Sequence, residues 1–341
     1  MADVRAPLRA DGEPPAAARS ATGGAQRRPA RPRRPVHGVL LIDKPVGWTS
    51  QDLLSKVKGL MRAEKAGHTG TLDPLASGLL PLCLGAATKF AQVSLDADKA
   101  YRATLHLGQT RRGGDREGEV LQERPLHVDR AALEAVLQRF SGPIRQVPPM
   151  HSALKHQGKA LYEYARAGVE IERAPREVIL HRLELIHWEA ECLVIDLSCS
   201  KGTYVRALAE DIGEALGCGA HLAALRRTAS GPLRIGQALT LEALQALDEA
   251  QRDALLLPPD ALLQAWPALQ LPAEEAGRFL SGLRRRVSAP DMPNVRVYGP
   301  EPRAFLGSAH VLAGELIADR LLSPPEVQAL LAAPHPAAQP A

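Results

Sequence analysis

The residue best suited to chemistry is Asp73, a carboxylate in the segment HTGTLDPL (residues 68–75). Apolar residues flank it, and the following proline disfavours helical dihedrals, so we expect the carboxylate on a stiff turn. A carboxylate with such neighbours stays ionised only if a cation or several donors stabilise it. It can then act as a nucleophile or a base. The local pattern is also typical of an aspartate that caps a helix or turn after Pro74.

The matching cation is Arg206, in the segment KGTYVR (residues 201–206). This segment follows an apolar strand pattern and begins a predicted helix, where the helix dipole disfavours a cation in the first turn. The position of Arg206 therefore calls for an anion, and Asp73 is the candidate. An exposed surface position for Arg206, and plain packing for Tyr101 and Tyr204, remain alternatives at this point.

The sequence lacks the usual signatures of cofactor, metal and membrane proteins. It contains no Walker A loop, no GxGxxG after a strand, no HExxH helix and no GxSxG elbow. The four cysteines show no CxxC spacing, which disfavours a zinc site and is typical of free thiols in a reducing cytoplasm. Apolar runs fall short of the roughly 18 residues of a membrane span, and no secretory signal opens the chain. We predict a cytoplasmic protein without cofactor or metal.

The basic residues are concentrated in an N-terminal arm. Residues 1–36 contain eight arginines and three acidic residues, so they carry +5 and the remaining residues −1 of the formal net charge of +4. Residues 1–35 are rich in Ala, Pro, Gly and Arg and show little apolar periodicity, so burial cannot offset the entropy of ordering. We predict a disordered arm, whose RRPARPRR run is either an RNA-phosphate contact, a solvated tail or part of a transit peptide.

The elements that must position Asp73 and Arg206 form an α+β pattern. An apolar run predicts a strand at residues 38–43, and alternation predicts a half-buried strand at residues 101–107. Two or three strands are expected between residues 178 and 200. The segment TSQD (residues 49–52) precedes a capped helix that is expected to run to residue 60, and Asp129 caps one expected to run to residue 140. A third helix is expected at residues 202–217.

This pattern predicts two folded domains. The first, residues 36–250, is expected to be a catalytic domain with a mixed, largely antiparallel sheet. The second, residues 262–323, is expected to be small and β-rich, with short strands around residues 295–298 and 314–317. Residues 324–341 are predicted to be a disordered tail.

Several of these segments together resemble the TruB family, the synthases that make pseudouridine 55 in the T arm of transfer RNA. The resemblance spans roughly residues 37–242 and implies the pseudouridine-synthase fold. Residues 262–323 resemble a small PUA-type RNA-binding module, whereas the long arm is not part of the family pattern. The motifs are HGVLLIDKPVGWTS (37–50), GHTGTLDPLASGLLPLCLGAATK (67–89), KAYRATLHLG (99–108), QVPPMHSALKHQGKALYEYAR (146–166), CSKGTYVRAL (199–208) and GCGAHLAALRR (217–227).

The resemblance implies a role for each matching residue. Asp73 in GTLDPLA corresponds to the catalytic aspartate, which favours catalysis over capping. Arg206 and Tyr204 correspond to the arginine that pairs with it and to a tyrosine that lines the uracil pocket. Tyr101 corresponds to the tyrosine that stacks on the target base. The remaining matches are His68, which would contact the T loop, Leu225, which would line the pocket, and Lys44, in a motif that buttresses the site.

The family chemistry implies a flipped uridine, no net redox change and no cofactor. Phosphate contacts would supply most of the affinity for transfer RNA, and a monomer without an obligate protein partner is expected. Alternatives are a non-catalytic tRNA-binding or folding chaperone and a family member that acts on another RNA. A hydrolase using Asp73 and His68 is disfavoured by the missing oxyanion loop and metal ligands. The candidate phosphate contacts are Lys56, Lys58, Arg62, Lys65, Arg226 and Arg227.

Overall fold

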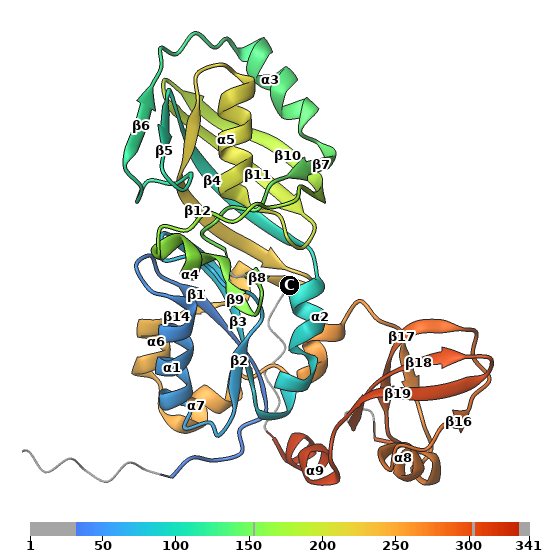
Figure 1. Cartoon of the computed structure of the whole chain (residues 1–341). Coiled ribbons are helices and arrows are strands. Elements are labelled where there is room, and N and C mark those ends of the chain that lie inside the picture. Colours follow the sequence, from blue (N-terminus) through green and yellow to red (C-terminus); the bar gives the residue numbers. More distant parts are fainter. Residues whose placement is uncertain (1–31, 153, 302–303, 334–341) are drawn as a thin grey trace, which may run out of the picture. The chain divides into compact units, whose positions relative to one another are not determined.

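The structure, a computed structural model, describes residues 32–152, 154–301 and 304–333 (Figure 1). Its largest feature is a ten-stranded sheet in the order β14-β1-β3-β12-β4-β11-β10-β7, with β13 beside β12 and β2 beside β3. The strands are β1 (Gly38–Lys44), β2 (Ala66–His68), β3 (Ala76–Leu84), β4 (Lys99–Leu107), β7 (Gly142–Gln146), β10 (Arg176–Glu189), β11 (Cys192–Cys199), β12 (Ala220–Ser230), β13 (Leu233–Arg234) and β14 (Leu239–Thr240).

The sheet is mixed and largely antiparallel, which confirms the predicted fold class. Only the β1/β14 and β3/β12 pairs are parallel among the strand pairs of the described sheet. In β4 the side chains of Ala103, Leu105 and Leu107 are fully buried, because a period of two places them on the same face. Two long strands, β10 and β11, form where two or three short ones were expected.

Three stretches that are far apart in the sequence lie side by side at the centre of the sheet. On β12, Leu225 lies opposite Ala76 of β3 and Ala103 of β4. Two residues further, Arg227 lies opposite Gly78 of β3 and opposite Tyr101 of β4. The loop that carries Asp73 leads directly into β3, so the strand order brings all three motifs to one place.

The predicted caps begin the first two longer helices. The Thr49 hydroxyl accepts a hydrogen bond from the backbone of Asp52 at 3.0 Å, at the start of α1 (Ser50–Leu60). The Asp129 carboxylate accepts one from Ala132 at 2.8 Å, at the start of α3 (Arg130–Arg139). The helix predicted at residues 202–217 is α5 (Val205–Ala215).

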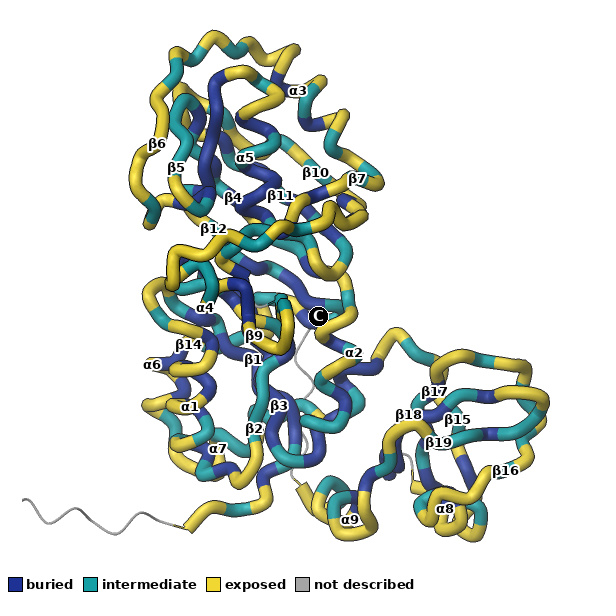
Figure 2. Tube along the Cα trace, viewed as in Figure 1, coloured by how far each residue is buried: buried dark blue, intermediate teal, exposed yellow. Residues whose placement is uncertain are grey.

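The sheet and its helices enclose separate apolar cores (Figure 2). One core packs Leu208 and Ile212 of α5 against Leu105 of β4. Another packs Leu53 of α1 against Leu40 of β1. Removing such side chains from water supplies most of the stabilisation of this domain.

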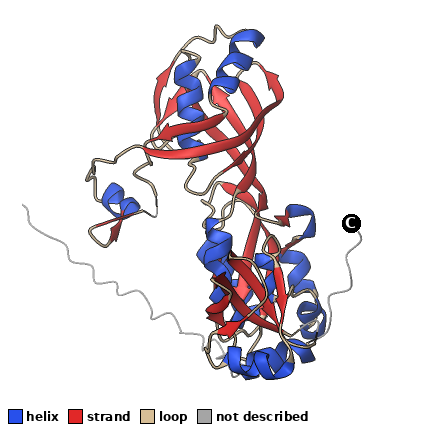
Figure 3. Ribbon diagram, turned by 90° about the vertical axis from the view of Figure 1, so that its right-hand side faces the viewer, coloured by secondary structure: helices blue, strands red, loops and turns tan. Residues whose placement is uncertain are grey.

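Short elements complete the large domain. The hairpins β5 (Gln109–Arg111)/β6 (Val120–Glu123) and β8 (Lys155–His156)/β9 (Lys159–Ala160) extend from it. The segment with β8, β9 and α4 (Leu161–Arg166) projects on long loops (Figure 3). The remaining helices are η1 (Gly85–Phe90), α2 (Ala91–Asp96), η2 (Ile235–Gln237), α6 (Leu241–Ala246), α7 (Glu249–Ala254) and η3 (Pro259–Leu263). Within the described ranges, every helix is too short or too polar to cross a membrane.

A second, five-stranded sheet follows, as predicted for residues 262–323. Its order is β15-β17-β18-β19-β16, and α8 (Ala273–Leu280) packs Phe279 into its core. Strand β17 contains the short strand expected at residues 295–298, and β19 overlaps the one expected at residues 314–317. The strands are β15 (Ala268–Gln270), β16 (Arg285–Arg286), β17 (Met292–Tyr298), β18 (Phe305–Leu312) and β19 (Glu315–Leu321).

The structure corrects both predicted disordered ends. A helix, α9 (Pro324–Ala332), occupies most of the predicted tail, because Ser323 and Glu326 form a capping box and prolines occupy its first positions. At the other end, Arg34 is held by Asp253 through an ion pair of 2.5 Å, so the predicted arm stops short of residue 35. Residues 1–31 and 334–341, which hold the rest of both predictions, lie outside the described residues.

Candidate active site

The loop between β2 and β3 holds Asp73 in a defined backbone position. The hydroxyl of Ser50 donates to the carbonyl of Leu72 at 3.0 Å and accepts from its N–H at 2.8 Å. The N–H of Gly47 donates to the carbonyl of Pro74 at 2.8 Å. The loop is thus tied on both sides of Asp73, whose side chain is 44% exposed. A turn at Pro74 and Leu75 follows, in which the N–H of Ala76 donates to the carbonyl of Asp73 at 3.0 Å, and then strand β3 begins. Asp73 therefore begins a turn and not a helix.

The structure brings Arg206 and Asp73 together. Nη2 of Arg206 lies 3.2 Å from Oδ2 of Asp73, and Nη1 lies 3.5 Å from Oδ2 of Asp115. The guanidinium also donates to the carbonyls of His151 at 2.6 Å and Gly113 at 3.4 Å. Its side chain is only 9% exposed. A buried arginine with these partners holds the exposed carboxylate in one direction.

The second carboxylate of the site, Asp115, was not found from the sequence. It follows Gly113 and Gly114 in a tight turn, both with positive φ, which favours glycine. The turn docks on β12, because Leu222 donates to the carbonyl of Gly114 at 2.9 Å and accepts from Arg116 at 3.0 Å. An aspartate after two glycines was the available signal, but its contact with Arg206 depends on this docking.

The two aromatic candidates are both half-buried. Tyr101 is half-buried at the start of β4, and burial raises the pKa of its phenol. Tyr204 precedes α5, and burial raises its pKa too, so both hydroxyls are neutral near pH 7. Gln146, to which the sequence assigned no role, fixes the backbone of Tyr204. Its side chain accepts from the N–H at 3.1 Å and donates to the carbonyl at 3.3 Å.

The other three predicted residues surround this centre. His68 is half-buried on β2, burial lowers its pKa, and its Nδ1 has no hydrogen-bond partner in the described structure. Leu225 is partly buried on β12 between β3 and β4. Lys44 is fully buried, and its ammonium donates to the carbonyls of Pro45 at 2.9 Å and Trp48 at 2.7 Å. Burial lowers its pKa to about 8, against the opposing charge of Asp73. Lys44 therefore lies behind the site.

The candidate phosphate contacts differ in exposure and in their ion-pair partners. Lys56 and Lys65 are exposed. Arg226 forms an ion pair of 2.6 Å with Asp43. For Arg227 the surface prediction is wrong, because its residue is only 1% exposed and its side chain points into the domain. Successive residues of a strand face opposite ways, so only one of the two neighbouring arginines can reach solvent.

A third acidic group, Glu210, lies one turn after Arg206 on α5. Its carboxyl packs against Gly114, in the turn that carries Asp115. Burial raises the pKa of Glu210 to about 7, and the negative charge of Asp211 adds to this. The folded protein therefore keeps a proton on Glu210 that the unfolded chain loses near its ordinary pKa of 4.5.

Because the folded state keeps this proton, we expect the free energy of unfolding to fall as the pH rises. Between pH 4.5 and 7 the folded state binds more protons at Glu210, so the free energy of unfolding decreases with pH. The variant Glu210→Gln is expected to be more stable than wild type at pH 8, by up to about 2 kcal/mol, and equal to it at pH 4.5. Urea unfolding at both pH values measures this. The exposed Glu214→Gln serves as control, and an equal gain in both variants would contradict the prediction.

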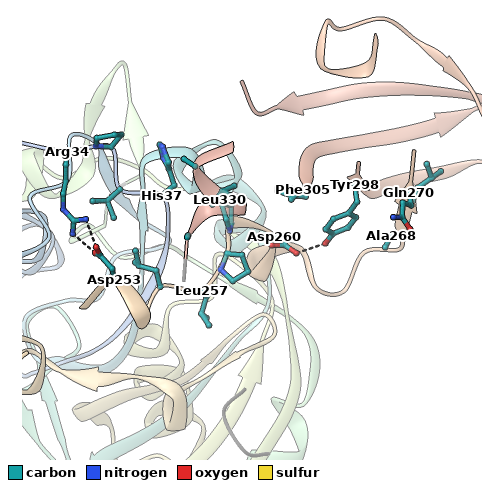
Figure 4. Close-up of a pocket in the computed structure, with 18 residues that line it drawn as sticks. Arg34, His37, Asp253, Leu257, Asp260, Ala268, Gln270, Tyr298, Phe305 and Leu330 are labelled. Atoms are coloured by element: carbon teal, nitrogen blue, oxygen red, sulfur yellow. Dashed lines mark hydrogen bonds and ion pairs between the residues drawn. The ribbon is translucent and has the colours of Figure 1, made fainter. Parts of the chain in front are cut away.

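A cavity of about 710 Å³ lies elsewhere, between η3, α9 and the second sheet (Figure 4). Two pairs of its polar wall residues contact each other. Arg34 pairs with Asp253, and the Tyr298 hydroxyl donates to Asp260 at 2.6 Å. None of the predicted site residues lines this cavity. The chemistry is therefore expected at the open surface around Asp73 and not in this cavity.

Comparison with protein-family models covers most of the chain. The TruB family pseudouridylate synthase N-terminal domain matches residues 58–205. The tRNA pseudouridylate synthase B C-terminal domain matches residues 206–264, and the pseudouridine synthase II TruB C-terminal domain matches residues 267–322. The N-terminal match includes Asp73, Tyr101 and Tyr204, and the next begins at Arg206.

Similar proteins and structures agree with these matches. A protein named tRNA pseudouridine synthase B from Verminephrobacter eiseniae (strain EF01-2) is 56% identical over 307 residues, which cover 88% of this chain and 93% of that protein. One with the same name from Cupriavidus pinatubonensis is 53% identical, covering 88% and 99%. A chain of a Cbf5-Nop10-Gar1 complex has a TM-score of 0.66 at 25% identity, covering 85% of this chain and 86% of that one. The motifs, the fold and these relatives agree, and the chain belongs to the TruB family of pseudouridylate synthases.

Proposed function

We propose that this enzyme isomerises uridine 55 in the T arm of transfer RNA to pseudouridine, as a cytoplasmic monomer. The names of its relatives support a transfer RNA substrate. The observation that carries the proposal is the pair of Asp73 and Arg206, 3.2 Å apart, with the carboxylate 44% exposed and the arginine 9% exposed. A charged group is thus held in place and open to a substrate. The buried free thiols of Cys83, Cys199 and Cys218 support a reducing compartment.

The reaction needs only side chains of the kind found at this site. The bond between C1′ and N1 breaks, the uracil turns, and a new bond joins C1′ to C5; C5 then loses its proton and N1 gains one, so no net oxidation or transfer of a group occurs. Asp73 acts at the sugar or the base, by attack at C1′, by attack at C6 or by removal of a proton at C2′. In each case the carboxylate must be ionised, and Arg206 stabilises that state.

The target base must leave its stack before Asp73 can reach it. Unstacking costs about a few kcal/mol, which stacking on a protein ring and contacts to the base edge offset. Tyr101 is the stacking residue of this proposal, and Tyr204 and Leu225 line the uracil pocket. His68 is neutral near pH 7 because burial lowers its pKa, and in this proposal the exposed part of its ring contacts the T loop, since its Nδ1 is buried. Lys44 supports the site from behind.

The function is tested with three RNAs and no added metal or cofactor. Purified protein is incubated with unmodified transfer RNA transcript, with a T-arm hairpin, and with a transcript in which uridine 55 is replaced by cytidine. Chemical probing then maps pseudouridine. We expect product at one T-loop position in the first two RNAs and none in the third. Binding without product would favour a non-catalytic chaperone, and product at other positions would favour another RNA substrate.

Asp115 is expected to act through Arg206. The variant Asp115→Asn removes one of the two charged partners of Arg206, so the guanidinium is held less firmly against Asp73. A loss of about 1.4 kcal/mol of transition-state stabilisation corresponds to a tenfold lower rate, which we expect in single-turnover assays. Asp115 is buried, so transfer RNA affinity is expected to stay unchanged. A rate equal to wild type would show that the Asp73 contact alone holds Arg206.

A further inference from the structure

Arg227 is the largest fully buried side chain of the described residues, and the proposed reaction does not use it directly. It lies on β12, and burial lowers the pKa of its guanidinium. Within residues 32–152, 154–301 and 304–333, no carboxylate forms an ion pair with it. A buried cation without a counter-ion is unfavourable unless its environment supplies acceptors for its donors. The five N–H groups of its guanidinium therefore need hydrogen-bond acceptors within the fold.

The hydrogen-bond acceptors of Arg227 lie in and beside the loop that carries Asp73. Nε donates to the carbonyl of Leu79 at 2.7 Å, and Nη2 donates to the carbonyl of Gly70 at 3.2 Å. These two carbonyls lie on either side of Asp73 in the chain. The guanidinium also lies beside the hydroxyl of Tyr101, its neighbour across the strand pair, close enough to interact with it electrostatically. The guanidinium of Arg227 therefore contacts the loop that carries Asp73, strand β3 and Tyr101, the proposed stacking residue.

Two glycines allow this arrangement, one through its small size and the other through its backbone conformation. A Cβ at Gly78 would lie 2.3 Å from the carbonyl oxygen of Arg227, so only glycine lets β3 approach β12 this closely. Gly70 has a φ of +122°, and a Cβ there would lie 3.6 Å from Nη1 of Arg227. The loop before Asp73 therefore lies directly against the guanidinium.

The charge of Arg227 also reaches its neighbours. It contributes to the lowered pKa of Lys44 and of His68, although burial is the larger cause for both. The pKa of Lys99 is lowered to about 8, first by burial and then by the same guanidinium. Arg227 therefore contributes to the electrostatic environment behind the loop and also contacts the backbone of that loop.

We propose that Arg227 is a positioning residue, which fixes the Asp73 loop and the ring of Tyr101 in one arrangement and so acts on the rate of isomerisation and not on transfer RNA affinity. The inference rests on the proposed function. Lysine cannot replace it fully, because a single ammonium on a flexible stem does not hold both carbonyls in the plane of a guanidinium. A methionine of similar length keeps the packing volume and removes every donor.

The test compares Arg227→Lys and Arg227→Met with a matched arginine outside the site. Arg252 of α7 also donates to backbone carbonyls, of Leu244 at 2.9 Å, Leu60 at 3.1 Å and Gln245 at 3.1 Å. Each variant is assayed for its single-turnover rate on transfer RNA, its dissociation constant and its thermal unfolding midpoint. Rates are taken well below the midpoint, so that every variant is folded.

We expect both Arg227 variants to be slower than wild type by about 100-fold, with dissociation constants within about threefold. Arg252→Met is expected to lose thermal stability without losing rate. Wild-type rates in the Arg227 variants, or a loss of affinity without a loss of rate, would overturn the proposal. An inactive wild-type protein would instead contradict the proposed function.

A second variant tests the same contact without changing Arg227. Tyr101→Phe keeps the ring and removes the hydroxyl that Arg227 contacts, so it is expected to lower the rate about tenfold. Combined with Arg227→Lys it is expected to cause little further loss, because both changes break one interaction. Fully multiplicative losses would contradict the link between Arg227 and Tyr101, and they can be measured even if Arg227→Met does not fold.

Discussion

Replacing Asp73 with asparagine is expected to abolish pseudouridine formation while transfer RNA still binds. Asparagine has the same shape, but its uncharged amide is neither a nucleophile nor a base under these conditions. Because the carboxylate takes part in bond making, we expect the single-turnover rate to fall by at least about 10⁴-fold. The backbone ties through Ser50 and Gly47 do not involve the side chain, so the loop is expected to keep its position.

The matched control for this change is Asp196→Asn. Asp196 lies in the same domain and pairs with the exposed Arg102 at 2.7 Å, so the control also removes one carboxylate from an arginine. It is expected to retain the wild-type rate, because an exposed pair contributes about 1 kcal/mol or less to stability. Product formation by Asp73→Asn at more than a hundredth of the wild-type rate would show that another group does the chemistry.

Replacing Arg206 with methionine is expected to cause the second largest loss. Asp73 and Asp115 would face each other across an apolar side chain, and Asp115 would remain as a buried charge without its cation. We expect a rate loss of about 10³-fold, together with lower stability, since breaking a buried pair from one side costs about 3–5 kcal/mol. Arg206→Lys is expected to lose about 10²-fold, because one ammonium cannot reach both carboxylates and the two carbonyls.

Single-turnover rates, transfer RNA binding and urea unfolding separate these effects. Arg102→Met provides the control for loss of an arginine, and it is expected to leave the rate unchanged. The double variant Arg206→Met/Asp115→Asn is expected to regain stability relative to Arg206→Met, because it removes the unpaired buried charge. If Arg206→Met has a lower free energy of unfolding but isomerises uridine at the wild-type rate, then Arg206 stabilises the fold and does not act on the carboxylate of Asp73.

The sequence alone determined the local features of this protein. Thr49 and Asp129 cap the helices predicted for them, because a cap depends on hydrogen bonds within four residues. The alternation from residue 101 to 107 marked β4 for the same local reason. The motif around Asp73 indicated the family, and the arginine in the first turn of a helix called for an anion. The capping box at Ser323 and Glu326 was equally visible in the sequence, and the tail prediction missed it.

Which distant residues share the site depends on how the strands and loops pack together. Asp115 becomes a partner of Arg206 because its turn docks on Leu222, more than 100 residues away in the chain. Arg226 and Arg227 look alike in the sequence, yet the pleat of β12 turns one toward Asp43 and the other beneath the Asp73 loop. A strand pattern fixes that neighbours point to opposite faces, whereas the face that becomes buried depends on which strands pair with it. For this reason local motifs predicted the residues that react. The residues that position them could be identified only from the structure, in which β3, β12 and β4 lie side by side.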